Sequence, residues 1–302
     1  MGHNQALSDS HEDLYPSRVS DTPRLIERCD PVFYGQHSDS GPLNQEQINF
    51  YEENGYLFFE SLFSQEQVQR YRRELDALSS APLVKEAPQT ILEPESQEVR
   101  SIFDIHRTNE LFKQLSQDER IVSMITQLLN SRVYIHQSRI NYKPGFQGKE
   151  FYWHSDFETW HEEDGMPRMR AISCSITLTE NNIYNGPLML IPKSHKYFLC
   201  CAGKTPKDHY KSSLKKQEYG VPDNKNLERL VEMGGIVAPH GPAGSVIFFE
   251  CNLMHGSNSN ISPWPRSNIF FVYNSVENTL VQPYCGLSPR PTYIANREFI
   301  PI

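Results

Sequence analysis

The 302-residue sequence contains no apolar run that could cross a membrane, which takes about 20 consecutive apolar residues. Its first 40 residues also lack the apolar stretch of a secretion signal. Basic residues are in the minority, with 29 Lys and Arg against 37 Asp and Glu and a net charge of −8. Nucleic-acid binding needs a basic surface, so neither nucleic acid nor an anionic membrane is an expected partner. We therefore expect a cytoplasmic enzyme or binding protein.

Cysteine pairs with the spacing of a zinc or redox site are also missing from the sequence. None of the six cysteines forms a C-x-x-C motif, and the adjacent Cys200 and Cys201 have no zinc-like spacing to another pair. Disulfide frameworks are typical of short secreted chains, and this chain is long and has no export signal. We expect most of the cysteines to be reduced and structural.

The first third of the chain is predicted to be mostly helical. Residues 1–42, rich in Ser, Asp, Pro and His, are expected to form an extended N-terminal arm. A helix is expected from Asn44 to Asn54, and Ser64 begins a capping box for a second helix. A further helical stretch is predicted over residues 109–129, where apolar residues recur at helical spacing.

After Ser131 the apolar period changes to two, which is typical of strands. Five strands are expected, at residues 133–142, 170–178, 187–191, 244–249 and 268–274. Turns rich in Pro, Gly and Asn separate them. A helical first third and a β-rich remainder indicate a barrel or jelly roll that is buttressed by helices.

One short stretch carries residues suited to metal binding, and it reads FYWHSDFETWH over residues 151–161. In an extended segment, residues two apart point to the same side, so His154 and Asp156 can converge on one metal ion. A third ligand, His255, follows the apolar strand predicted at residues 244–249. Two imidazoles and one carboxylate leave coordination positions open, which suits non-haem iron(II) and oxygen.

A chance H-x-D pair is common in a chain with eleven histidines, so the pair needs support from elsewhere. We interpret the other four candidates as structural or solvent-facing; they are His136, His161, His195 and His240. Support comes from an ordered downstream series, namely N-G-P-L at 185–188, I-P-K-S-H at 191–195, H-G-S at 255–257, and Arg266. An arginine at this position can form a bidentate pair with a carboxylate held near the metal.

This series resembles the phytanoyl-CoA dioxygenase-related family of iron(II)- and 2-oxoglutarate-dependent dioxygenases, over roughly residues 40–297. Within it, residues 151–167 are similar to the signature of ectoine hydroxylases. Lys193 departs from the wider family, which often has Gly in this turn. The resemblance implies a mainly β fold, a double-stranded β-helix (jelly-roll, cupin-like) barrel with N-terminal helices packed outside. Residues 43–302 would be a single dioxygenase domain, with helical support at 43–131 and a jelly-roll core at 132–302 that carries an insertion near 201–235.

The resemblance also implies roles for individual residues. His154, Asp156 and His255 would bind iron(II) at the catalytic centre. Arg266 would pair with the distal carboxylate of 2-oxoglutarate, helped by Asn141 and Ser175. Six residues would bind ectoine: Gln137, Thr159, Trp160, Phe249, Phe270 and Arg290. Aromatic faces attract the delocalised amidinium cation of ectoine, although without the resemblance the two phenylalanines would be read as barrel core.

The implied reaction is the hydroxylation of ectoine to 5-hydroxyectoine, a compatible solute of osmotic and heat stress. Iron(II) would be the cofactor, 2-oxoglutarate and O2 the cosubstrates, and succinate and CO2 the co-products. A homodimer is expected on the same grounds. Two alternatives stay open: a related dioxygenase that hydroxylates another small zwitterionic or amino-acid-derived substrate, and a jelly-roll binding protein without catalysis.

Overall fold

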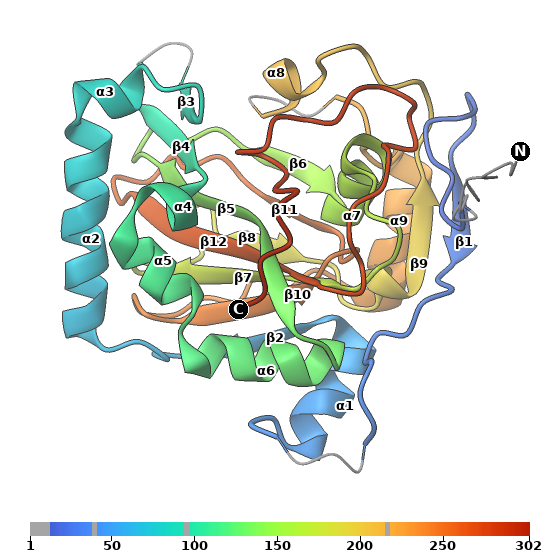
Figure 1. Ribbon diagram of the computed structural model, residues 1–302, viewed down its shortest axis with the longest axis horizontal. Coiled ribbons are helices and arrows are strands. Elements are labelled where there is room, and N and C mark those ends of the chain that lie inside the picture. Colours follow the sequence, from blue (N-terminus) through green and yellow to red (C-terminus); the bar gives the residue numbers. More distant parts are fainter. Residues whose placement is uncertain (1–12, 38–40, 94–96, 215–217) are drawn as a thin grey trace, which may run out of the picture.

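A computed structural model describes residues 13–37, 41–93, 97–214 and 218–302 (Figure 1). Two antiparallel sheets make up its centre, and helices cover the outside of the larger one. The larger sheet has the order β2-β10-β7-β12-β5-β4-β3, and the smaller one the order β6-β11-β8. This confirms the expected mainly β jelly-roll fold. Among the described residues β2 and β3 remain edge strands, so the barrel is not closed.

The strands of the larger sheet are β2 (Tyr56–Phe59), β3 (Thr90–Leu92), β4 (Val99–Phe103), β5 (Val133–Lys143), β7 (Ala171–Thr177), β10 (Val246–Glu250) and β12 (Arg266–Ser275). The strands of the smaller sheet are β6 (Phe151–His154), β8 (Leu188–Leu190) and β11 (His255–Ser257). All five strands that the sequence predicted are present, with ends that differ by up to two residues.

The helices that precede β5 in the chain are α1 (Gln45–Asn54), α2 (Gln65–Ser80), α3 (Pro82–Lys85), α4 (Ile105–Thr108), α5 (Glu110–Ser116) and α6 (Glu119–Leu129). The capping box at Ser64 is confirmed: its hydroxyl accepts from the amide of Gln67, whose side chain accepts from the Ser64 amide. The helical stretch predicted over residues 109–129 is two helices. It breaks because the Asp118 carboxylate accepts from the Arg120 amide and so caps a new helix start.

The two faces of β12 separate the structural core from the cavity. Alternate residues point to opposite faces, so Ile269 and Phe271 pack in the core that α2, α5 and α6 cover, while Phe270 faces the smaller sheet. On the neighbouring β5, a bulge shifts the register, because Val272 pairs with Gln137 and Tyr273 pairs with Ile135. The bulge reverses the alternation, so that odd-numbered residues face the core up to Ile135 and face the cavity from Gln137 to Asn141.

The N-terminal arm and the segment around residues 201–235 lie along the sides of the two sheets. In the arm, β1 (Arg24–Glu27) pairs antiparallel with β9 (Tyr197–Cys200) at the right of Figure 1. The remaining elements are α7 (Asp156–Thr159), η1 (Trp160–Asp164), η2 (Ser194–Lys196), α8 (Tyr210–Ser213) and α9 (Asn224–Gly234). Parts of the predicted arm (1–12 and 38–40) and of the predicted insertion (215–217) lie outside the described residues.

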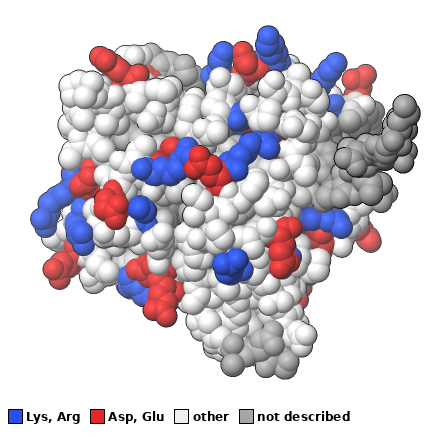
Figure 2. Space-filling view, viewed as in Figure 1, with Lys and Arg blue, Asp and Glu red and all other residues white. Residues whose placement is uncertain are grey.

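Charged residues of both signs are interspersed on the face shown in Figure 2, and neither sign forms a large patch there. All six cysteines are free thiols, as the sequence predicted. Within the described ranges, no helix combines the length and the apolar character that a membrane crossing requires.

Candidate active site

Three potential metal ligands meet where β6 and β11 lie side by side. His154 is the last residue of β6 and His255 the first of β11, and the two are direct cross-strand partners. Asp156 begins α7, and the extended backbone of Ser155 keeps its side chain on the same side as His154. The Asp156 carboxylate oxygens lie 3.7 Å from Nε2 of His154 and 3.7 Å from Nε2 of His255. One ligand atom from each residue lies within 4.8 Å of the others, so the trio predicted from the sequence does converge.

Both imidazoles are held in the tautomer that a metal ligand needs. Nδ1 of His154 donates to the Tyr152 carbonyl at 2.7 Å, and Nδ1 of His255 donates to the Leu253 carbonyl at 2.9 Å. Because a carbonyl only accepts, each Nδ1 carries the proton, and each Nε2 presents a lone pair toward Asp156. This donor set, two imidazoles and one carboxylate, fits iron(II).

The electrostatics of the trio favour the same protonation states. Burial lowers the pKa of His154 to about 4, and the nearby His255 adds to this, so His154 is neutral at pH 7. Burial alone would raise the pKa of Asp156, but His255, His154 and Arg139 outweigh it and lower that pKa. A neutral imidazole and an ionised carboxylate need no proton loss before a cation binds.

A second part of the site holds buried positive charge. Arg266, at the start of β12, is 5% exposed, and within the described residues its Nε and Nη1 have no hydrogen-bond partner. Burial lowers the pKa of Arg266 to about 10. Nearby, Lys143 donates to the Ser257 hydroxyl at 2.9 Å, and burial together with Arg266 lowers its pKa to about 6. Arg266 is therefore a buried cation available to an anion such as a dicarboxylate, while Lys143 is mostly neutral at pH 7 until an anion binds beside it.

The predicted substrate residues lie around the same cavity. Trp160, the first residue of η1, is buried beside it, and Thr159 is the last residue of α7. The guanidinium of Arg139 lies 4.8 Å above the ring of Phe270. Arg290 also lines the cavity, and its Nε and Nη2 donate to the two oxygens of Asp164 at 2.7 and 2.6 Å.

Ten of the twelve predicted site residues line one cavity: Gln137, Asn141, His154, Asp156, Thr159, Trp160, His255, Arg266, Phe270 and Arg290. The other two lie behind its wall in the described structure. Phe249 is fully buried, with its ring centroid 5.0 Å from that of His255. Ser175 is buried on β7, where its hydroxyl accepts from the Asn268 amide at 2.9 Å.

Arg139 is not among the site residues that the sequence analysis named, yet it lines the cavity. The signal was available, because Arg139 lies between Gln137 and Asn141 and shares their face of β5. Ser213 and Leu214 also line the cavity, and their place after the charged segment near 201–211 gave no local signal. His161, interpreted as structural, is buried and bonded to Asp13 of the arm at 2.9 Å.

The chain is similar to proteins of known activity over nearly its whole length. An ectoine dioxygenase of Bordetella bronchiseptica is 55% identical over 287 residues, which are 95% of this chain and 93% of that protein. A crystal structure of EctD from S. alaskensis with 2-oxoglutarate and 5-hydroxyectoine aligns with a TM-score of 0.86 at 46% identity, covering 95% of both chains. The same protein with bound Fe aligns with a TM-score of 0.85 at 45% identity over 95% of both chains. The phytanoyl-CoA dioxygenase (PhyH) family matches residues 51–268, and the chain belongs to that family.

Proposed function

We propose that this protein hydroxylates ectoine to 5-hydroxyectoine with iron(II), 2-oxoglutarate and dioxygen, forming succinate and carbon dioxide. The observation that carries the proposal is one cavity that holds both the His154, Asp156 and His255 trio and the unpaired Arg266. The EctD structure that holds 2-oxoglutarate and 5-hydroxyectoine together supports the choice of cosubstrate and substrate.

The metal would be held by Nε2 of His154, Nε2 of His255 and the carboxylate of Asp156. Iron(II), when bound, activates dioxygen with electrons from the decarboxylation of 2-oxoglutarate and supplies the oxidant for a C–H bond. The protein contributes the fixed tautomers of the two histidines, because their Nδ1–H groups are engaged by backbone carbonyls. It also keeps the trio largely away from bulk water, since Asp156 and His255 are buried.

The cosubstrate would lie with its distal carboxylate on Arg266. The Nε and Nη1 atoms that lack partners in the described structure are donors for such a pair. Lys143, mostly neutral in the ligand-free protein, would take up a proton beside the bound carboxylate, while Asn141 lines the cavity and accepts from the Ser101 hydroxyl at 2.8 Å. Ser175 would act indirectly, because its hydroxyl holds the Asn268 amide in place.

Ectoine would be held between aromatic faces and arginines. Its delocalised amidinium cation suits the faces of Trp160 and Phe270, and Phe249 would support the wall from behind His255. Thr159 and Gln137 would supply polar contacts. The substrate carboxylate would lie near Arg290, whose Nη1 is outside its fork to Asp164, and near Arg139.

The test is to incubate the purified protein with iron(II), 2-oxoglutarate and ectoine and to analyse the products by mass spectrometry. We expect one added oxygen atom and equal amounts of succinate. His154→Ala, Asp156→Ala and His255→Ala should each lose iron and hydroxylation, whereas the exposed His240→Ala should keep both. Iron binding with no 2-oxoglutarate turnover would favour the binding protein. Turnover with another small zwitterion and none with ectoine would favour the related dioxygenase.

We further propose that the enzyme acts in the cytoplasm as a homodimer. Reduced iron and 2-oxoglutarate are both supplied by cytoplasmic metabolism, and the net charge of −8 argues against a nucleic-acid partner. Cell fractionation tests the location, and sedimentation analysis across a range of concentrations tests the assembly. A protein that stays monomeric at every concentration would contradict the dimer.

A further inference from the structure

The turn between β10 and β11, residues 251–254, leads directly into the ligand His255. It is bonded to the segment that carries the other two ligands at two points. The Ser155 hydroxyl donates to Oδ1 of Asn252 at 2.9 Å, and the Phe157 amide donates to the Cys251 carbonyl at 2.9 Å. Ser155 lies between His154 and Asp156, so the position of this turn sets the position of one ligand segment relative to the other.

The side chain of Asn252 is fixed in one orientation. Its Nδ2 donates to the carbonyls of Tyr197 at 2.8 Å and His195 at 3.3 Å, which leaves Oδ1 for Ser155. Its backbone amide donates to Oε2 of Glu250 at 2.7 Å. Glu250 therefore holds the residue that connects the two ligand segments.

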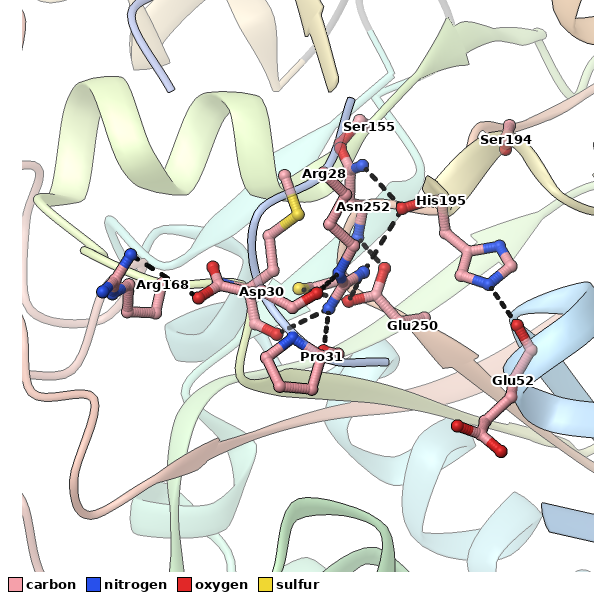
Figure 3. Close-up of polar contacts among 12 residues, drawn as sticks. Arg28, Asp30, Pro31, Glu52, Ser155, Arg168, Ser194, His195, Glu250 and Asn252 are labelled. Atoms are coloured by element: carbon pink, nitrogen blue, oxygen red, sulfur yellow. Dashed lines mark hydrogen bonds and ion pairs between the residues drawn. The ribbon is translucent and has the colours of Figure 1, made fainter. Parts of the chain in front are cut away.

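Glu250 is held in turn by Arg28 of the N-terminal arm (Figure 3). Nη1 of Arg28 lies 2.9 Å from Oε1 of Glu250, and the two side chains are 4% and 2% exposed. Among the described residues, Arg28 is the only ion-pair partner of Glu250. The other guanidinium N–H groups donate to backbone carbonyls of four residues: Asp30, Pro31, Met169 and His195.

The I-P-K-S-H motif braces the other end of the turn. The Ser194 hydroxyl accepts from the Met254 amide at 2.9 Å, and the Ile191 amide donates to the Met254 carbonyl at 2.9 Å. The His195 carbonyl accepts from both Arg28 and Asn252. Figure 3 shows Arg28, Glu250 and Asn252 together, with His195 at their side and its ring directed toward Glu52.

We propose that Arg28 is a positioning residue of the metal site, which it reaches through Glu250, Asn252 and Ser155. The proposal rests on the proposed function, because it takes the trio to be the metal site. A lysine at residue 28 would keep the charge but lacks the planar fork that contacts Glu250 and four carbonyls at once. Changes to residues that orient metal ligands typically weaken metal binding by about 10- to 100-fold.

Metal affinity of the full-length protein is the direct test, with cobalt(II) alone as the probe and its visible absorption as the readout. We expect Arg28→Lys to bind cobalt(II) about tenfold more weakly and to change the shape of its absorption bands. Ser155→Ala removes the hydrogen bond between Ser155 and Asn252 and leaves the N-terminal arm unchanged. It should also weaken the binding of cobalt(II). If Arg28→Lys does not fold, Glu250→Gln keeps the shape of the side chain, removes its charge and gives the same expectation.

Arg170→Lys is the matched control. Arg170 also donates to two backbone carbonyls, those of Leu129 and Asn130, and pairs with Glu277 at 2.5 Å, away from the turn that leads into His255. The Arg170→Lys substitution should lower the melting temperature without changing the affinity for cobalt(II). The proposal is overturned if Arg28→Lys lowers only the melting temperature, as Arg170→Lys does. If the unchanged protein takes up no cobalt(II), the proposed function itself fails.

Discussion

Two sets of buried basic side chains in this molecule differ in their partners. Where the arm and η1 meet the jelly roll, each buried arginine contacts a carboxylate, in the pairs Arg18–Glu158, Arg28–Glu250 and Arg290–Asp164. At the cosubstrate end, Arg266 and Lys143 form no ion pair with any described residue. Both groups are equally inaccessible to water, so burial does not explain the difference.

The presence or absence of a carboxylate partner indicates which buried basic side chains bind an anionic ligand. A buried charge without a partner is costly, so paired arginines can serve the fold while unpaired ones need a charge from outside the chain. Removing a paired arginine should therefore cost stability, and removing an unpaired one should cost ligand affinity. The following variants test this separation.

The largest effect on stability should come from Arg18→Ala. Arg18 contacts Glu158 at 2.6 Å and Glu163 at 2.7 Å, and its loss leaves buried carboxylates without their partner. We expect the free energy of unfolding to fall by about 3–5 kcal/mol in urea titrations. Lys193→Ala is the control, because its pair with Glu53 is exposed and should contribute at most about 1 kcal/mol. Equal losses in the two variants would contradict the role given to the paired group.

Arg266→Ala should show the opposite pattern. We expect the transition-state stabilisation calculated from kcat/KM for 2-oxoglutarate to fall by on the order of 2–5 kcal/mol, with little change in the melting temperature of the ligand-free protein. Arg266→Lys should recover only part of the loss, because an ammonium cannot form the bidentate pair. A large loss of stability with unchanged 2-oxoglutarate kinetics would place Arg266 with the paired arginines.

Trp160 lies in η1, close to the paired group, but it faces the cavity. Trp160→Ala should weaken ectoine binding by on the order of 1–3 kcal/mol while iron content stays the same. Succinate should still form without matching hydroxylation, and Trp160→Phe should be milder. Lower melting temperature and lost iron together, with no selective effect on ectoine, would show that Trp160 serves only the core.

The smallest expected effect on stability concerns Glu162, a further buried acid beside the paired arginines. Burial, together with Glu158, raises its pKa to about 8 from an ordinary value of 4.5. The folded state therefore favours the protonated acid, and this stability is present below pH 4.5 and is lost as the pH rises through 8. Glu162→Gln should melt a few degrees higher than the unchanged protein at pH 9 and about equally at pH 5. A difference that does not vary with pH would argue against a protonated Glu162.

The sequence predicted those parts of the fold that depend on local signals. Asn44 and Ser64 each form a capping box with a glutamine three residues later, and β12 follows from a continuous run of β-branched and aromatic residues between polar ones. Asp118 was missed as a cap because it lies inside an otherwise continuous apolar pattern. The metal trio was predicted from residue type, spacing and family resemblance. The Arg28–Glu250 pair could not be predicted, because neither residue has a local pattern that identifies a buried partner far along the chain.

The position of Arg18 and Arg28 has a consequence for where this protein can be cut. The family match begins at residue 51, so an expression fragment designed on that boundary would omit both arginines. Glu158 and Glu250 would then be buried beside the metal ligands without their counter-charges. We therefore expect the smallest fragment that folds on its own to be longer than residues 51–268 and to include β1, the strand that pairs with β9.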